Sequence, residues 1–427
     1  MTKIVVFGPG PGFKGGIANF NISLAKGFAM LEKTETHIVS WINQYPFFIP
    51  REFLDDKSQI DLLEKSGVTV HYTMNYNRFS TWQKTYNKIV EINPDFVVIQ
   101  TASLSQSPPI GYLIRQIKAN TTIRVIADLH FGNRKEYSKT IRMLARYAIG
   151  CADAYITHSF RTAFDVKSLF PEINFDLIEG TDSVSDNTNK PILKLYHPIY
   201  DMYAPDPNFD VATNKKQLNL RQYVFLFFGF MYKYKGLHNA IAAFAELAKT
   251  RDDISLLIVG ESSWQSPIRD RKRDRFKRMF SRELRAQFIS RREDEKNYRP
   301  IEMIDRLGIR DKVTVVNDFI PNDEVHKYFQ VSDAIVLFYE TASASGVESI
   351  AYNFKLPIVA TQVGHFPETV KDGITGYLAK SDDISSMAEA MLNIIEQPIL
   401  SKNVEEASKS MSWENYAESI RKLASSL

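Results

Sequence analysis

The stretch MTKIVVFGPGPGFKGGIANF, from Met1 to Phe20, decides the fold class. Its apolar, β-rich run Lys3–Phe7 is followed by a glycine-rich turn and then by the helical spacing of Ala18–Leu31. A strand, a glycine turn and a helix in this order are typical of the start of a Rossmann-like α/β domain.

The same alternation continues along the chain in two series, which predicts parallel sheets with crossover helices. In the first series we expect strands at His37–Trp41, Val68–Tyr72, Phe96–Gln100, Arg124–Ala127 and Ala154–His158, and a helix at Thr81–Ile92. Prolines interrupt the pattern over Leu193–Asp210, which we interpret as a linker. In the second series we expect strands at Val224–Phe228, Ser255–Val259, Val313–Val316, Ala334–Phe338 and Pro357–Ala360, and helices at Asn239–Lys249, Asp323–Gln330 and Ile384–Glu396. Two Rossmann-like halves predict a ligand in the cleft between them.

Composition narrows the class of protein. The chain has 427 residues, 44% of them hydrophobic, with 53 Lys plus Arg against 50 Asp plus Glu. A net charge of +3 does not indicate nucleic-acid binding by the whole chain, and a single cysteine, Cys151, permits no intrachain disulfide. No apolar run approaches the roughly 20 residues that span a bilayer. We therefore expect a cytoplasmic α/β enzyme.

The glycine-rich turn GPGPGFKGG, Gly8 to Gly16, indicates phosphate binding. It contains G-x-G-x-x-G, but the second strand ends Val39-Ser40-Trp41 without the acidic residue that a dinucleotide fold uses for the ribose. What remains is a loop that feeds a helix N-terminus, where exposed amides and the helix dipole favour a phosphate. The alternative is a tight turn that needs glycine only for its backbone geometry.

Two further motifs lie in the second half. In FFGFMYKYKG, Phe227 to Gly236, a strand ends in glycine and Lys235 follows just before a helix, where it can hold a diphosphate or can simply be solvated. In FYETASASGVESIAYNFKLPIVA, Phe338 to Ala360, Glu340 and Glu348 flank a run of small residues. Their carboxylates can accept hydrogen bonds from sugar hydroxyls, or can be ordinary surface charges.

The three motifs, in this order, resemble the family 4 retaining glycosyltransferases of the GT-B fold, specifically the bacterial subgroup that builds surface polysaccharides. The resemblance covers nearly the whole chain and includes further short pieces: QYP at Gln44–Pro46, PDFVVIQ at Pro94–Gln100, ADAYITHS at Ala152–Ser159 and HPIYDMY at His197–Tyr203. It implies two Rossmann-like domains with parallel sheets facing across a cleft: 1–203 for the acceptor, and 204–405 for the nucleotide sugar. Residues 406–427 would form a C-terminal helix that packs back on the first domain.

The resemblance also implies the site residues. Gly15 and Gly16 would face the diphosphate, Lys235 would neutralise it with Lys233 nearby, and Gly229 would belong to the same pocket. Ser345, Gly346 and Val347 would meet sugar or phosphate together with Glu340. Glu348 would take the ribose hydroxyls, and His130 would lie near the donor sugar; the alternative for His130 is a structural histidine at a strand end.

Two departures from the family pattern are visible. Phe230 and Tyr232 stand where an arginine is usual, and counting back from Pro357 puts Ile350, not Glu348, at the second-glutamate position. The roles of Glu340 and Glu348 therefore stay open between these residues and their shifted neighbours.

The predicted function is transfer of a sugar from a UDP- or GDP-linked donor to a glycan or lipid-linked acceptor, with retention of configuration. His130, Lys235 and Glu340 are the candidate catalytic residues. No Asp-x-Asp triplet occurs, and His37, His71 and His326 have no metal-ligand spacing, so we expect no metal and no cofactor beyond the co-substrate. The alternatives are an inactive GT-B partner subunit and a nucleotide-sugar epimerase-like enzyme.

A basic helical insertion is expected at about 264–300. Within 269–299, thirteen basic residues face six acidic ones, and Phe276, Met279, Phe280, Leu284 and Phe288 share one helix face. Such a helix either packs its apolar face on its own domain or lies on anionic lipid, which would make the protein peripheral on the inner face of the cell membrane.

If the insertion binds lipid, deleting 269–299 abolishes co-sedimentation with anionic vesicles, because both the charge and the apolar face are lost. The deleted protein must still be stabilised by its nucleotide-sugar donor, which controls for misfolding. Equal sedimentation of the intact and deleted proteins contradicts the lipid interpretation.

Overall fold

The computed structural model describes residues 1–47, 54–55, 57–58, 61–130, 139–180, 189–262 and 297–427. Residues 269–296 of the basic stretch lie outside this description. The chain forms two compact units. The first comprises Met1–Asp56, Asp61–Pro198 and Met411–Leu427; the second comprises Lys57–Ile60 and Ile199–Ser410.

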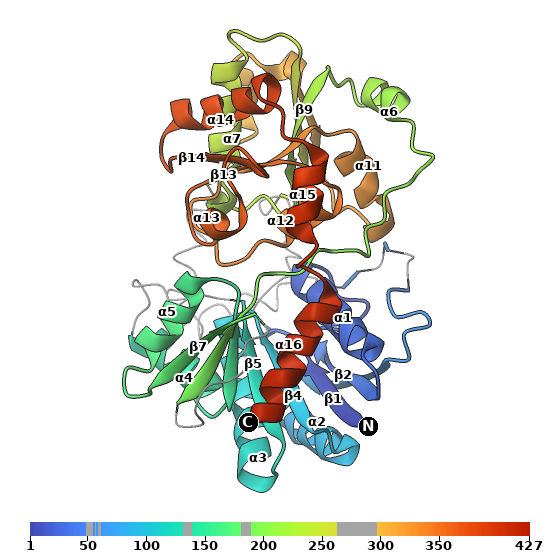
Figure 1. Ribbon diagram of the computed structural model, residues 1–427, viewed down its shortest axis with the longest axis vertical. Helices are drawn as coiled ribbons and strands as arrows, with labels where there is room; N and C mark the ends of the chain where they lie inside the picture. Colours follow the sequence, from blue (N-terminus) through green and yellow to red (C-terminus); the bar gives the residue numbers. More distant parts are fainter. Residues whose placement is uncertain (48–53, 56, 59–60, 131–138, 181–188, 263–296) are drawn as a thin grey trace, which may run out of the picture. The chain divides into compact units, whose positions relative to one another are not determined.

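The first unit is built on an eight-stranded sheet in which the strand pairs are parallel, in the order β3-β2-β1-β4-β5-β6-β8-β7 (Figure 1). Its strands are β1 Thr2–Phe7, β2 Thr34–Asn43, β3 Thr69–Asn75, β4 Phe96–Thr101, β5 Arg124–Leu129, β6 Ala154–Thr157, β7 Phe175–Glu179 and β8 Lys190–Lys194. Its helices are α1 Gly16–Met30, α2 Phe79–Ile92, η1 Leu104–Gln106, α3 Ser107–Asn120, α4 Lys139–Ile149, α5 Phe160–Leu169 and α16 Trp413–Ser426.

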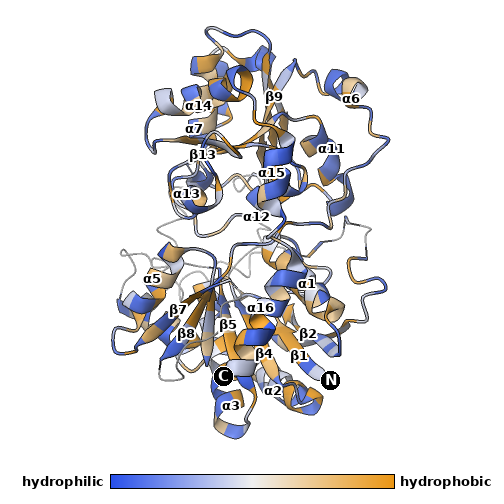
Figure 2. Cartoon of the chain, in the orientation of Figure 1, coloured by the Kyte–Doolittle hydropathy of each residue, from blue (hydrophilic) through white to orange (hydrophobic). Residues whose placement is uncertain are grey.

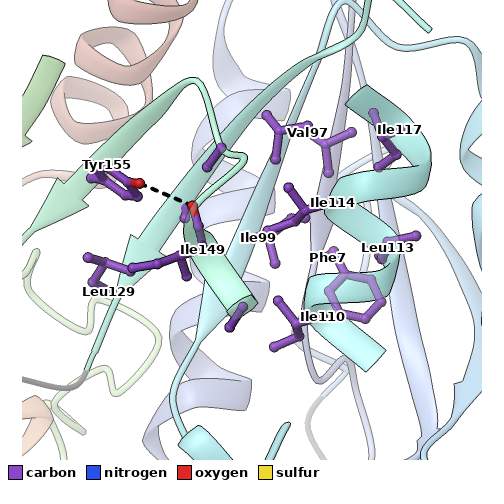
Figure 3. Packing of buried hydrophobic residues seen from close by; sticks show 14 of the residues in the cluster. Phe7, Val97, Ile99, Ile110, Leu113, Ile114, Ile117, Leu129, Ile149 and Tyr155 are labelled. Atoms are coloured by element: carbon purple, nitrogen blue, oxygen red, sulfur yellow. Dashed lines mark hydrogen bonds between the residues drawn. The ribbon is translucent and has the colours of Figure 1, made fainter. Parts of the chain in front are cut away.

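The central strands of this sheet are hydrophobic on both faces. Every residue of β4 is buried, and Figure 2 shows β1, β4 and β5 mainly in the hydrophobic colours. Figure 3 shows how α3 covers one face, where Ile110, Leu113, Ile114 and Ile117 are packed in one cluster with strand residues. Full burial of each such side chain stabilises the fold by about 1.5–3 kcal/mol.

The last helix belongs to the first unit, as expected from the sequence. Helix α16 packs against α1 (Figure 1), and Trp413 and Tyr416 both approach the ring of Phe20. Covered by the sheet and by α16, helix α1 buries ten of its 15 residues, including the polar Asn21.

The second unit is built on a six-stranded sheet, again with parallel pairs, in the order β11-β10-β9-β12-β13-β14. Its strands are β9 Tyr223–Phe228, β10 Ile254–Val259, β11 Val313–Val316, β12 Ala334–Leu337, β13 Ile358–Thr361 and β14 Gly376–Ala379. Its helices are α6 Val211–Gln217, η2 Lys233–Lys235, α7 Leu237–Leu247, α10 Glu302–Arg306, η3 Arg310–Lys312, η4 Asn322–Glu324, α11 Val325–Gln330, α12 Gly346–Asn353, α13 Phe366–Thr369, α14 Ile384–Glu396 and α15 Ser401–Ser408.

The expected strands and helices of both series are present, most of them within two residues of the expected bounds. Three strands went unpredicted: β7 and β8 at one edge of the first sheet, and β14 at one edge of the second. The expected linker also began too early, because Leu193 and Lys194 are the last two residues of β8. Among the described residues, no helix is both long and apolar enough to cross a membrane.

The contact between α1 and α16 predicts that Gly27→Ala destabilises the protein. A Cβ at Gly27 would lie 2.7 Å from the backbone oxygen of Trp413, so the helices must separate. Alanine gains about 1 kcal/mol of helix propensity, and overpacking costs about 1–3 kcal/mol, so we expect a lower melting temperature.

Met30→Ala is the matched control, because Met30 lies on the same helix with 64% of its surface exposed. Its unfolding free energy is expected to stay within about 0.5 kcal/mol of the wild type. A Gly27→Ala protein as stable as the control would contradict the close packing of the two helices.

Candidate functional site

Both sheets have a strand at which the winding direction reverses. In the first sheet β1 lies between β2 and β4, and in the second β9 lies between β10 and β12. At such a strand, the loop that leaves its carboxyl end and the loop that leaves a neighbouring strand run in opposite directions. Ligands of open α/β sheets bind in the crevice between these two loops. The motifs singled out in the sequence follow β1, β9 and β12.

In the second unit, the loop after β9 brings Lys235 back to the strand end. Gly229 follows β9 directly with φ of 100°, and a Cβ there would meet Nζ of Lys235 at 3.1 Å and Cγ2 of Val347 at 3.6 Å. Gly236 has φ of 65° and touches the end of β12, because a Cβ there would lie 1.8 Å from the oxygen of Phe338. The glycines thus let the β9 loop close tightly over the neighbouring strand.

The loop after β12 supplies the other side of this site. The backbone amide of Glu340 donates to the carbonyl of Tyr234 at 2.8 Å, which joins the two loops. Ser345 caps α12 by accepting from the amide of Glu348, so the helix begins at Gly346. Val347 in its first turn and Nζ of Lys235 both lie against Gly229. A helix N-terminus carries partial positive charge, and here it lies next to an ammonium group.

Lys235 is the charged centre of this group. Burial lowers the pKa of its ammonium to about 8, and its Nζ lies 5.9 Å from the centre of the Tyr339 ring. A cation that is partly stripped of water gains most from a ligand that brings negative charge. Lys233 lies on the same short helix, η2, and is half-buried.

Glu348 faces inward. Its residue surface is 4% exposed, and its carboxylate lies 2.5 Å from Nε2 of His365 and accepts a hydrogen bond from the hydroxyl of Thr369. The carboxylate therefore anchors α12 to α13 inside the second unit.

Glu340 is the more accessible of the two glutamates. Its side chain is 36% exposed, and its Oε1 lies 3.4 Å from Nε2 of His238 at the start of α7. The imidazole in turn contacts the hydroxyl of Tyr298 through Nδ1 at 3.0 Å. Glu340 is thus held at the carboxyl edge of the sheet, next to the loop that carries Lys235.

In the first unit, the glycine-rich loop after β1 is fixed by hydrogen bonds from three neighbouring elements. The amide of Gly10 donates to Oγ of Ser40, Nδ2 of Asn21 donates to the carbonyl of Pro9, and the hydroxyl of Tyr72 donates to the carbonyl of Pro11. The loop enters α1 through Gly15, which has φ of 101° and serves as N-cap without a side-chain hydrogen bond. Gly15 and Gly16 therefore lie where a helix N-terminus meets the carboxyl edge of the sheet.

His130 follows β5 at the same edge of the first sheet. Its amide donates to the carbonyl of Thr101, and its Nε2 lies 2.5 Å from Oε1 of Gln100. Burial lowers the pKa of the His130 imidazole to about 4, which makes it neutral at physiological pH.

The structure adds residues around His130 that the sequence reasoning missed. Asp128, His130 and His158 place one ligand-type atom each within 4.8 Å of one another, a grouping that could hold a metal ion. Part of the signal was present in the sequence: His158 ends the expected strand Ala154–His158, and His130 lies three residues beyond the expected strand Arg124–Ala127. Adjacent parallel strands end at the same edge of a sheet.

The site residues named from the sequence fall into two groups. One group gathers at the carboxyl edge of the second sheet and consists of Gly229, Lys233, Lys235, Glu340, Ser345, Gly346 and Val347. The other gathers at the carboxyl edge of the first sheet and consists of Gly15, Gly16 and His130. Glu348 belongs to the second unit but has its carboxylate turned toward His365 and Thr369.

Comparison with known protein families finds a match for the second unit. Residues 208–411 match the model of the family "Glycosyl transferases group 1". A stretch of 116 residues is 26% identical to N-acetyl-alpha-D-glucosaminyl L-malate synthase of Bacillus anthracis, over 27% of this chain and 30% of that protein. A stretch of 132 residues is 28% identical to D-inositol 3-phosphate glycosyltransferase of Mycolicibacterium smegmatis, over 28% of each chain. The match thus spans less than a third of the length of these curated relatives.

Solved structures match the whole chain. HepE of Anabaena in complex with UDP-glucose superimposes with a TM-score of 0.67 over 99% of this chain and 100% of its own, at 16% identity. Sucrose-phosphate synthase from Thermosynechococcus elongatus gives 0.66 over 100% and 99%, at 15% identity. At these identities the likeness establishes the fold, which is GT-B. Residues 208–411, within the second unit, are similar to the glycosyl transferases group 1 family.

Proposed function

We propose that this protein is a retaining glycosyltransferase that uses a nucleoside-diphosphate sugar. One observation carries the proposal: Lys235, Gly229 and the N-terminus of α12 converge at the carboxyl edge of the second sheet. An ammonium, a side-chain-free backbone and a helix N-terminus together suit a diphosphate. The match of this unit to the glycosyl transferases group 1 model supports the same assignment.

The donor is proposed to bind as follows. Lys235, with Lys233 nearby, faces the diphosphate, and the Gly346 and Val347 amides complete its cradle beside Ser345. Glu340, whose carboxylate is accessible, meets the hydroxyls of the sugar. Glu348 acts indirectly, because its carboxylate holds α12 against α13 and thereby keeps the N-terminus of α12 in place.

The proposed chemistry is a front-face displacement. As the bond between the sugar and the phosphate breaks, negative charge grows on the departing diphosphate and positive charge on the sugar. Lys235 and the helix N-terminus stabilise the growing negative charge, and the glycine loop at Gly15 and Gly16 adds a second helix N-terminus. The leaving phosphate takes the proton of the acceptor hydroxyl, and His130 is proposed to act on the donor sugar.

The reaction is proposed to need no metal, because the protein's own positive groups face the diphosphate. The acceptor is proposed to be a glycan or lipid-linked glycan used in surface polysaccharide synthesis, at the cytoplasmic side of the membrane. Two similar structures support these proposals: HepE was solved with UDP-glucose, and another is a lipopolysaccharide outer core galactosyltransferase.

An inactive partner subunit is the second candidate, and the geometry of Glu348 favours it. A donor site whose second glutamate is engaged internally has lost one direct contact to the nucleotide sugar. An epimerase-like enzyme is distinguished by its product, since it would turn over the donor without any acceptor.

The first test is a thermal-shift panel of nucleoside diphosphates and nucleotide sugars, with and without EDTA. A ligand at 100 times its Kd stabilises the folded state by about 2.7 kcal/mol, so a specific donor raises the melting temperature clearly. We expect one UDP- or GDP-sugar to give the largest shift and EDTA to leave it unchanged, with acceptor-dependent release of the nucleoside diphosphate. Binding without turnover over a wide acceptor panel identifies the inactive subunit, and no shift with any donor contradicts the proposal.

The pKa of Lys235 predicts how donor binding depends on pH. A lysine with a pKa of about 8 is mostly charged at pH 7 and mostly neutral at pH 9. The electrostatic attraction for the diphosphate is therefore complete below pH 7 and is lost as the pH rises through 8. We expect the affinity for UDP-glucose, whose diphosphate does not titrate in this range, to fall by up to about tenfold between pH 7 and 9.

Lys235→Ala should bind weakly at both pH values and lose this pH dependence. Lys249→Ala is the matched control, because Lys249 is an exposed lysine of the same unit that pairs with Glu246 at the end of α7. If Lys235→Ala binds and turns over the donor like the wild type, Lys235 is not a diphosphate ligand.

A further inference from the structure

A fully buried carboxylate lies beneath His130. Asp128, the residue before the last of β5, has no exposed surface. Its Oδ1 lies 3.0 Å from Nε2 of His158 and 3.8 Å from Nε2 of His130. These two imidazoles also lower the pKa of the Asp128 carboxyl, against the opposing effect of its burial. Asp128 is therefore an ionised group whose electrostatic partners are histidines.

The sheet register explains why these groups meet. Strands β4, β5 and β6 pair in parallel, with Gln100 opposite Asp128 and Leu129 opposite Thr157. His130 and His158 each follow the last of these paired residues, and their rings stack with centroids 4.7 Å apart and planes at 27°. Gln100 reaches across from β4 to Nε2 of His130. The imidazole of His130 is thus held between the ends of two strands.

Helix α16, near the C-terminus of the chain, packs against this group of side chains around His130. The ring of Tyr416 stacks on His158 at 6.3 Å with planes at 12°, and Phe20 packs edge-on against His130 and Tyr416. Burial, and after it the neighbouring Asp128 carboxylate, raise the pKa of the Tyr416 hydroxyl. Tyr416 therefore stays a neutral phenol beside the anion.

A buried carboxylate is costly unless its partners compensate it, and removing one partner leaves a buried charge uncompensated. A structural core at this place could be made of apolar side chains at lower cost. The group instead combines one anion, stacked imidazoles and a phenol directly behind a residue at the carboxyl edge of the sheet, where function is located in this fold.

We propose that Asp128, His158 and Tyr416 are positioning residues that fix the imidazole of His130 before the donor arrives. This inference rests on the proposed function, in which His130 works beside the donor sugar. Misplacement of a catalytic group by about 1 Å can cost on the order of a hundredfold in rate, so loss of one positioning residue must lower kcat. Donor affinity is spared, because none of these three positioning residues is assigned to the diphosphate.

The experiment compares two pairs of isosteric variants. Asp128→Asn removes the charge and Tyr416→Phe removes one hydroxyl. Their controls are Asp153→Asn, which removes a charge that binds Lys118 and the amide of Val125, and Tyr155→Phe, which removes a buried hydroxyl that donates to the carbonyl of Ile149 (Figure 3). All four changes lie in the first unit, and each control removes the same kind of group, a carboxylate charge or a tyrosine hydroxyl, away from His130.

Turnover is measured as nucleoside diphosphate released from the nucleotide sugar that gives the largest thermal shift, with the acceptor that it requires. We expect kcat to fall about tenfold or more in Asp128→Asn and several-fold in Tyr416→Phe, with the KM for the donor unchanged. The controls lose stability but keep the kcat of the wild type. A second readout does not depend on activity: ¹⁵N-labelled histidine NMR, with the ring signals of His130 assigned through His130→Gln.

We expect the ring signals of His130 to move in Asp128→Asn and Tyr416→Phe and to stay in place in Tyr155→Phe. Wild-type kcat in both cluster variants, or unmoved His130 signals, would overturn the inference. So would a stoichiometric metal ion, found by elemental analysis and absent from Asp128→Asn, because Asp128 would then be a ligand. A wild-type protein that transfers no sugar defeats the proposed function instead, and the NMR comparison still decides whether the cluster positions His130.

Discussion

The constraint on which the structure depends is that both sheets are parallel and covered on both faces. A strand such as β4, buried along its whole length, cannot present a polar side chain to a ligand without burying it in the core. Chemistry is therefore confined to the carboxyl ends of the strands, where loops leave the sheet and helices begin. In both units the candidate groups occupy these ends, and both reversal points of the winding, beside β1 and β9, carry a glycine-rich loop.

Among the charged side chains at these edges, Asp128, Glu348 and Lys235 differ in how their charge is compensated. Asp128 and Glu348 each have an imidazole within hydrogen-bonding distance, so their charge is compensated inside the fold. Lys235 is held against Gly229 and the ring of Tyr339, and burial alone accounts for the lowering of its pKa. The two carboxylates are thereby committed to holding the protein together, whereas the lysine is best compensated by an anion from outside. This asymmetry is what a site for an anionic ligand requires.

The amount that could be predicted from the sequence follows from which signals are local. The strands β1, β4, β9 and β10 are apolar runs bounded by turn residues, so the local sequence is enough to predict them. Edge strands cannot be predicted in this way. Strand β7 has the mixed pattern FDLIE and β14 has only four residues, so neither produces a strong periodic signal. Lys235 was found because it follows a strand-ending glycine. The inward turn of Glu348 could not be found, since it depends on His365 and Thr369 in another helix.

The group around His130 illustrates a second limit, because its members come from distant parts of the chain. Gln100, Asp128 and His158 lie at the ends of three neighbouring strands, whereas Tyr416 belongs to α16. Residues 199–410 form the second unit and separate α16 from the rest of the first unit in the sequence. Closing the chain across such a separation costs conformational entropy, and burial of the helix face against α1 helps to offset this cost. Packing of Trp413 and Tyr416 on Phe20 therefore has two roles. It docks α16 on α1, and it completes the surroundings of Asp128 and His130.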